Sequence, residues 1–148
     1  MIKEVKGNLL IAPTDVLVNP VNCVGVMGAG LALQFKEVYP DMFRSYQRAC
    51  REGDLVPGRM HVWQTGEFRP AYVINFPTKK HWRDKSELIW IEQGLLSLTK
   101  VLASLPVQSV AIPALGCGLG GLDYEDVREC VYRVFSDTSL DLRLYTPG

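Results

Sequence analysis

Short apolar runs alternate along this chain with longer segments in which apolar residues recur every three or four positions. The short runs predict six strands, at Ile2–Val5, Val16–Val21, Met60–Trp63, Tyr72–Phe76, Ser109–Ile112 and Asp141–Tyr145. The longer segments predict four helices, which begin after Gly30, after Pro40, near Glu87 and after Asp123. This alternation is typical of an α/β domain with a largely buried sheet.

Two of the predicted helices have a polar residue at the position where a capping side chain is expected. Ser86 is the predicted N-cap of the longest helix, Glu87 to Ser104, and Asp123 is the predicted N-cap of the last one. Both side chains can accept a hydrogen bond from a free N–H group of the first helical turn. The last helix therefore begins beside the glycine-rich segment that precedes Asp123.

Length and composition predict a single domain over residues 1–148, because 148 residues that are 47% hydrophobic can bury a substantial core. The chain stops directly after a predicted strand, so we expect it to be the N-terminal part of a longer protein. Sixteen basic residues balance sixteen acidic ones, so any contact with nucleic acid must be local. We expect a cytoplasmic monomer without a membrane segment, since no stretch approaches about 20 apolar residues.

The four cysteines are widely spaced and the chain has only two histidines, which argues against a disulfide framework and against a bound metal. Cys117 lies within a glycine-rich segment and could be considered a nucleophile. No histidine lies near it in sequence, so packing is the favoured role for its side chain.

Two glycine-rich turns each follow a predicted strand: the first glycine turn (residues 25–30) and the second glycine turn (residues 116–121). Glycines let backbone N–H groups converge on a ligand, and a helix that starts nearby adds its dipole, so such turns hold phosphate oxygens. Each could instead be a tight strand-to-helix connection, but two together favour a diphosphate site. Neither the dinucleotide fingerprint of a Rossmann fold nor a P-loop motif is present.

A basic segment (residues 75–85) follows the fourth predicted strand and contains Trp82 among four basic residues. A tryptophan beside cations can stack on a nucleobase while the cations meet phosphate, although a solvated loop is the alternative. Neighbouring positive charges favour the free amine of Lys80, which could then act as a base or a nucleophile. Two amides lie in an apolar strand region: Asn22 is the better ligand candidate, and Asn19 is more typical of a structural role.

Taken together, these segments resemble the macrodomain family of ADP-ribose-binding modules over nearly the whole chain. The resemblance is carried by Gly7–Leu10, by Asn19–Asn22 and by the two glycine turns. It implies a three-layer α/β/α sandwich with a central mixed sheet. Within the family, Gly25–Ala32 and Asn75–Trp82 are similar to the macrodomains of bacterial DarG antitoxins, which remove ADP-ribose from thymine bases in DNA and so reverse the toxin DarT.

The resemblance also implies roles for particular residues. It implies an ADP-ribose site built from Asn8, Leu9, Asn22, Gly28, Ala29, Gly30, Leu31, Leu115, Gly116, Cys117, Gly118, Leu119, Gly120 and Tyr145. Lys80 and Asn22 are the implied catalytic residues, and Lys79, His81, Trp82 and Arg83 the implied DNA contacts. The implied partners are ADP-ribosylated DNA and a DarT-type toxin, with no cofactor and no metal.

The chain departs from the family pattern at three places. Many macrodomains have aspartate where this chain has Asn8, the first glycine turn has no acidic residue, and Gly120 matches the catalytic aspartate of the human terminal ADP-ribose glycohydrolase. The implied lysine would therefore act without a carboxylate partner. Two alternatives stay open: a reader that binds ADP-ribose without cleaving it, and a hydrolase of ADP-ribosyl esters on glutamate or of O-acyl-ADP-ribose.

Overall fold

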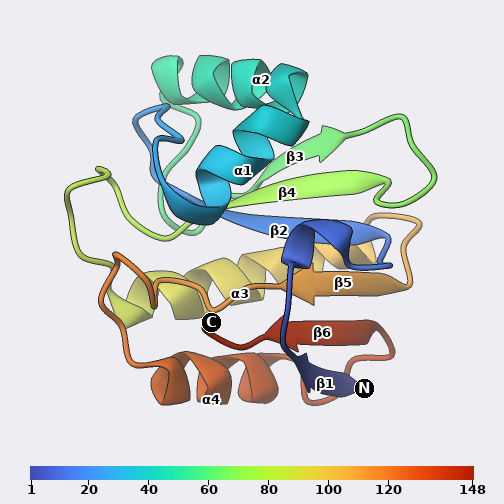
Figure 1. Ribbon diagram of the computed structural model, residues 1–148. Helices are drawn as coiled ribbons and strands as arrows, with labels where there is room; N and C mark the ends of the chain where they lie inside the picture. Colours follow the sequence, from blue (N-terminus) through green and yellow to red (C-terminus); the bar gives the residue numbers. More distant parts are fainter.

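The six strands form one mixed sheet in the order β1-β6-β5-β2-β4-β3, as the computed structural model of residues 1–148 shows (Figure 1). All neighbouring strands are parallel except β3, which runs antiparallel to β4. The strands are β1 (Ile2–Val5), β2 (Val16–Val21), β3 (His61–Gln64), β4 (Tyr72–Pro77), β5 (Ser109–Ile112) and β6 (Asp141–Tyr145). All six predicted strands are confirmed, with shifts of one residue at β3 and at the end of β4.

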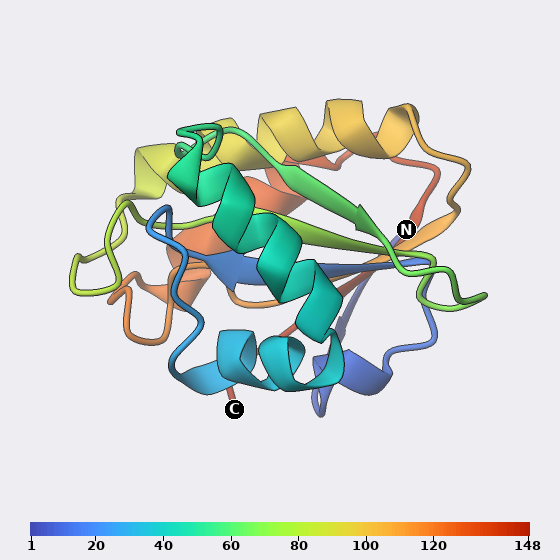
Figure 2. The same cartoon turned by 90° about the horizontal axis from the view of Figure 1, so that it is seen from above.

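Four α-helices cover the two faces of the sheet (Figures 1 and 2). The helices are α1 (Gly30–Val38), α2 (Pro40–Arg51), α3 (Leu88–Ala103) and α4 (Tyr124–Val134), and a 3₁₀ turn, η1 (Leu9–Ile11), follows β1. One cluster of 17 buried residues joins α3 and α4 to one face, and a second cluster of 11 joins α1 and α2 to the other. The predicted three-layer α/β/α sandwich is therefore confirmed.

Alternation along the strands sends side chains to both cores. In β2, Val16 and Val18 pack under α3 and α4, while Leu17 and Val21 face α1 and α2. All four are nearly or fully buried, which explains why the strand has an almost continuous apolar sequence. The parallel pairing of β2 with β4 and β5 also brings the carboxyl ends of these three strands to one edge of the sheet.

The two predicted helix caps have different outcomes. Asp123 is the N-cap of α4, and its carboxylate accepts a hydrogen bond from the Glu125 N–H at 3.0 Å, as predicted. The prediction for Ser86 is wrong, because α3 begins after Glu87, which has no capping side-chain bond. The Ser86 N–H instead donates to the Gly120 carbonyl at 3.0 Å, so this residue is tied to the second glycine turn.

A row of buried and partly buried polar groups runs from β2 through β4 and β3 to α2. Asn19 donates to Asn75 at 3.0 Å, the Asn75 Nδ2 lies 2.9 Å from the His61 Nδ1, and the His61 Nε2 lies 3.0 Å from the Ser45 hydroxyl. Both contacts of the His61 ring are satisfied when a neutral His61 accepts at Nδ1 and donates at Nε2. The buried Asn19 Oδ1 has no hydrogen-bond partner. Burial lowers the pKa of His61, which also favours the neutral form.

The first prediction concerns the pH dependence of stability. The unfolded chain protonates His61 at about pH 6.5, whereas the folded protein resists protonation until lower pH. The contribution of neutral His61 to stability is therefore complete above about pH 6.5 and is lost as the pH falls through the folded pKa. We expect the Tm to decrease between pH 7 and pH 5, and the decrease to be smaller in His61→Gln. Thermal unfolding across this range tests the expectation. The matched control is His81→Gln, at the only other histidine. If the Tm of wild type and of His61→Gln fell equally with pH, the prediction would be wrong.

Candidate functional site

A cleft of about 730 Å³ opens at the edge where β2, β4 and β5 end. Three connections line it: the β2–α1 connection with the first glycine turn, the β4–α3 connection with most of the basic segment, and the β5–α4 connection with the second glycine turn. Crevices at the carboxyl ends of parallel strands are where open α/β sheets bind ligands. The structure thus brings together, at one place, the three segments that the sequence singled out.

Asn22 holds the first glycine turn in shape. Its Nδ2 donates to the Val26 carbonyl at 2.8 Å, and its Oδ1 accepts from the Val24 N–H at 3.0 Å and from the Tyr46 hydroxyl at 2.8 Å. Asn22 also lines the cleft. Because Nδ2 has two hydrogens, one donor remains for a ligand, so the predicted ligand role and a loop-shaping role are compatible.

The first glycine turn and the start of α1 present free backbone donors. Gly28, Ala29, Gly30 and Leu31 line the cleft, and none of their N–H groups donates a hydrogen bond within the protein. Gly30 has a φ of 57°, which an L side chain rarely adopts, so the turn into α1 requires glycine here. Free N–H groups at a helix start form an anion site.

The second glycine turn forms the opposite wall. Gly116, Gly118, Leu119 and Gly120 line the cleft, and their N–H groups likewise donate to no acceptor within the protein. Two of the predicted residues of this turn do not line it. Leu115 is fully buried in the core, and the Cys117 N–H is bonded to the Ala114 carbonyl at 3.2 Å. Burial also raises the pKa of the Cys117 thiol to about 11, so it is not a thiolate at neutral pH.

Gly120 has no room for a side chain. A Cβ at this position would lie close to both the Ser86 hydroxyl and the Gly116 carbonyl oxygen, well inside the normal contact distance. Ser86 is buried, and its hydroxyl has no hydrogen-bond partner. An aspartate cannot occupy position 120 without displacing the backbone of this turn.

A second hollow of about 510 Å³ adjoins the cleft through Leu31, Pro113 and Ala114, which line both. It contains Asn8, Leu9 and Tyr145, three of the residues predicted from the sequence for the ADP-ribose site. Asn8 caps η1, and its side chain accepts from the Leu10 N–H at 3.0 Å. The cleft and the second hollow together form an elongated site that suits an extended ligand.

Two adjacent lysines of the basic segment have different surroundings. Lys79 lines the cleft, whereas Lys80, the predicted catalytic residue, does not. The Lys80 side chain is exposed, with its ammonium 5.6 Å from the centre of the Trp90 ring, and its carbonyl accepts from the Cys23 N–H at 2.9 Å. Burial and the neighbouring Lys85 lower the pKa of Lys79, against an opposing effect of Asp84.

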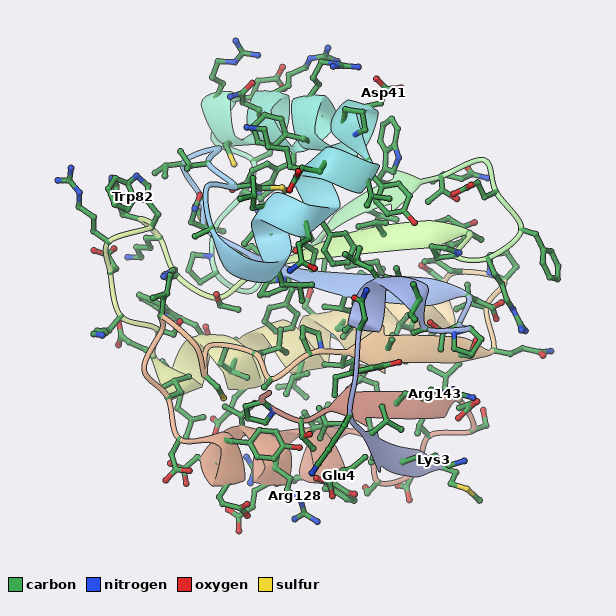
Figure 3. All side chains as sticks on the ribbon, in the orientation of Figure 1. Lys3, Glu4, Asp41, Trp82, Arg128 and Arg143 are labelled. Atoms are coloured by element: carbon green, nitrogen blue, oxygen red, sulfur yellow. The ribbon has the colours of Figure 1, made fainter.

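Trp82 lines the cleft, while His81 and Arg83 do not. The Arg83 guanidinium lies 4.6 Å from the centre of a Trp82 ring, and the rings of His81 and Trp82 are 5.1 Å apart. Figure 3 shows Trp82 on the outer part of the basic segment. The predicted DNA contacts thus form one surface cluster at the mouth of the cleft.

Sequence reasoning missed several residues that line the site. The missed residues are Pro20, Val21, Val26, Ala32, Thr78, Pro113 and Ala114 in the cleft, and Gly7, Gln34, Thr146 and Pro147 in the second hollow. Six of them lie inside motifs that were recognised: Gly7, Pro20, Val21, Val26, Ala32 and Thr78. Of the others, Ala114 and Thr146 lie directly beside a predicted site residue. Position relative to the strand ends was the available signal for them, because residue type alone marks none of them as functional.

The protein is an α/β/α sandwich in which two glycine turns meet at a cleft beside the carboxyl ends of the parallel strands. This combination is typical of a ligand-binding domain. Residues 18–131 match the family model for the Macro domain, and the chain belongs to this family.

The chain is similar to several proteins of known name. It is 50% identical over 150 residues to the DNA ADP-ribosyl glycohydrolase of Mycobacterium tuberculosis, a match that covers 100% of this chain and 43% of the relative. The chain therefore spans less than half the length of this curated relative. The solved macrodomain of Mycobacterium tuberculosis DarG has 49% identity and a TM-score of 0.98, with coverage of 100% of this chain and 99% of that one.

A second solved structure, Thermosipho africanus DarTG in complex with ADP-ribose, has 32% identity and a TM-score of 0.93. The match covers 99% of this chain and 41% of that chain. Among the helices of the present chain, none is both long enough and apolar enough to cross a membrane.

The second prediction concerns the tight packing at Gly120. Gly120→Ala forces the second glycine turn away from Ser86, and overpacking of this kind destabilises by about 1–3 kcal/mol. We expect a Tm lower by several degrees in thermal unfolding. Gly118→Ala is the matched control, since its Cβ would meet no atom within 4 Å. Equal Tm values for the two variants would contradict the prediction.

Proposed function

We propose that this domain hydrolyses the N-glycosidic bond between ADP-ribose and a thymine base of single-stranded DNA. It thereby reverses the modification made by a DarT-type DNA ADP-ribosyltransferase. The relatives named DNA ADP-ribosyl glycohydrolase support this proposal, because one of them aligns with the whole chain at 50% identity. The fusion protein of Thermosipho africanus, named for both activities, supports a toxin of this kind as the partner.

The single observation that carries the proposal is that Lys79 reaches the cleft between two sets of free N–H groups. In the proposed binding mode, these N–H groups hold the diphosphate, and adenine lies in the second hollow near Asn8 and Tyr145. The remaining donor of Asn22 then reaches the distal ribose. The base that leaves lies at the mouth of the cleft.

We assign the chemistry to Lys79 in place of Lys80. Lys79 is the only ionisable side chain that lines the cleft, and its lowered pKa increases the share of free amine. In hydrolysis, the bond between C1″ and the base nitrogen breaks, water supplies the hydroxyl at C1″, and the base nitrogen gains a proton. Lys79 either attacks C1″ transiently or transfers the proton between water and the base.

A reader that only binds ADP-ribose is the second candidate function. The observation that favours it is the lack of any carboxylate among the residues that line the cleft. Hydrolysis of ADP-ribosyl esters is a third, for which the same lysine could serve. These candidates differ in their substrates, so one set of assays separates them.

The third prediction compares the two neighbouring lysines on a single-stranded oligonucleotide that bears ADP-ribose on thymine. Lys79→Ala is expected to lower the rate of ADP-ribose release at least about 100-fold, the range in which acid–base groups contribute. Lys80→Ala is expected to stay within about threefold of wild type, because its side chain lies outside the cleft. The mass of the oligonucleotide reports the release.

If Lys80→Ala alone lost the release of ADP-ribose, the catalytic role would belong to Lys80. A wild-type protein that binds free ADP-ribose but releases none from the oligonucleotide would refute the proposed glycohydrolase. Cleavage of an ADP-ribosyl ester in that case would identify an ester hydrolase, and no cleavage of either substrate would identify a reader.

A further inference from the structure

The mouth of the cleft is more apolar than a sugar diphosphate requires. Three side chains that line it, Val26, Trp82 and Leu119, are 39%, 45% and 72% exposed, respectively. They come from three different connections: the first glycine turn, the basic segment and the second glycine turn. Each of the three walls of the cleft thus contributes one apolar side chain that is open to solvent.

Leu119 has no role in the core that would explain its presence. It lies between Gly118 and Gly120 and belongs to neither buried cluster. A leucine that is largely exposed in a glycine turn contributes little to folding, so its apolar surface is available to a ligand. The diphosphate and ribose are polar and bind N–H groups, so they do not need this surface.

Cations lie directly beside this apolar rim. The Arg83 guanidinium stacks on Trp82 at 4.6 Å, and Lys79 lines the cleft next to them. Apolar or aromatic faces together with cations match a nucleobase and its phosphates, because every base has a flat apolar face next to a charged backbone.

We propose that Val26, Trp82 and Leu119 form a slot for the modified nucleobase, and that Leu119 determines the preference for an unpaired base. The slot contacts base surface that is covered by neighbours and by the pairing strand in a duplex, so a paired base must first leave the stack. Single-stranded DNA is free of this requirement, because its bases have no pairing strand to leave. The inference rests on the proposed function and adds the structural element that selects the substrate.

The test uses Leu119→Ser, with Leu96→Ser as the matched control on the exposed side of α3, where Leu96 is 55% exposed. The substrates are a single-stranded oligonucleotide with ADP-ribose on one thymine, and the same oligonucleotide annealed to its complement. Calorimetric titration with free ADP-ribose measures the Kd of the part of the site outside the slot. Trp82→Ala provides a second variant of the slot.

We expect wild type and Leu96→Ser to cleave the single strand at least about tenfold faster than the duplex. Leu119→Ser and Trp82→Ala are expected to lower kcat/KM on the single strand roughly tenfold, the effect of one lost apolar contact or stacked base. Their Kd for free ADP-ribose is expected to stay within about twofold of wild type, because ADP-ribose has no group in the slot and Leu119→Ser keeps the backbone N–H that faces the diphosphate.

Three results would overturn the proposed slot. They are unchanged cleavage by Leu119→Ser, equal cleavage of single strand and duplex by wild type, or a loss of free ADP-ribose binding in Leu119→Ser as large as its loss of cleavage. If wild type cleaves neither substrate, the proposed glycohydrolase fails by itself. Binding affinities then test the slot. Wild type must bind the modified single strand more tightly than free ADP-ribose, and Leu119→Ser must lose that difference; otherwise the slot is also refuted.

Discussion

The hydroxyl of Tyr46 is the contact on which the geometry of the cleft depends. Tyr46 is a fully buried residue of α2, and its hydroxyl donates to the Asn22 carbonyl at 2.9 Å and to the Asn22 Oδ1 at 2.8 Å. Burial raises the pKa of this phenol, so it remains a donor. Asn22 in turn shapes the first glycine turn through Val24 and Val26. The packing of α2 against the sheet is thereby transmitted to the ligand-binding backbone.

The other two walls are joined to this one through backbone hydrogen bonds. The Cys23 N–H donates to the Lys80 carbonyl at 2.9 Å, which connects the end of β2 to the basic segment. At its far end, the same segment is connected to the second glycine turn by Ser86 and Gly120. The three connections therefore form one linked rim. Since each wall carries part of the site, their mutual bonds fix the distances between the groups that meet the ligand.

The elements and the general location of the site could be predicted from the sequence, because strand periodicity and glycine turns are local signals. The choice between Lys79 and Lys80 could not. Both lysines lie beyond the end of β4, where the backbone follows no regular pattern, so periodicity does not tell which side chain enters the cleft. Ser86 failed as a predicted cap for a similar reason. Its N–H has a partner 34 positions away, and no local pattern reveals that contact.

The packing around Gly120 leaves no room for an acidic side chain at that position, which has a chemical consequence. Ser86 and the Gly116 carbonyl fill the space beside Gly120, so a carboxylate has no place there. A carboxylate next to Lys79 would stabilise its ammonium form and raise its pKa. Without one, burial and Lys85 lower the pKa of Lys79, and Asp84 opposes them from outside the cleft. The arrangement therefore increases the share of free amine, the form in which a lysine acts as a base or a nucleophile.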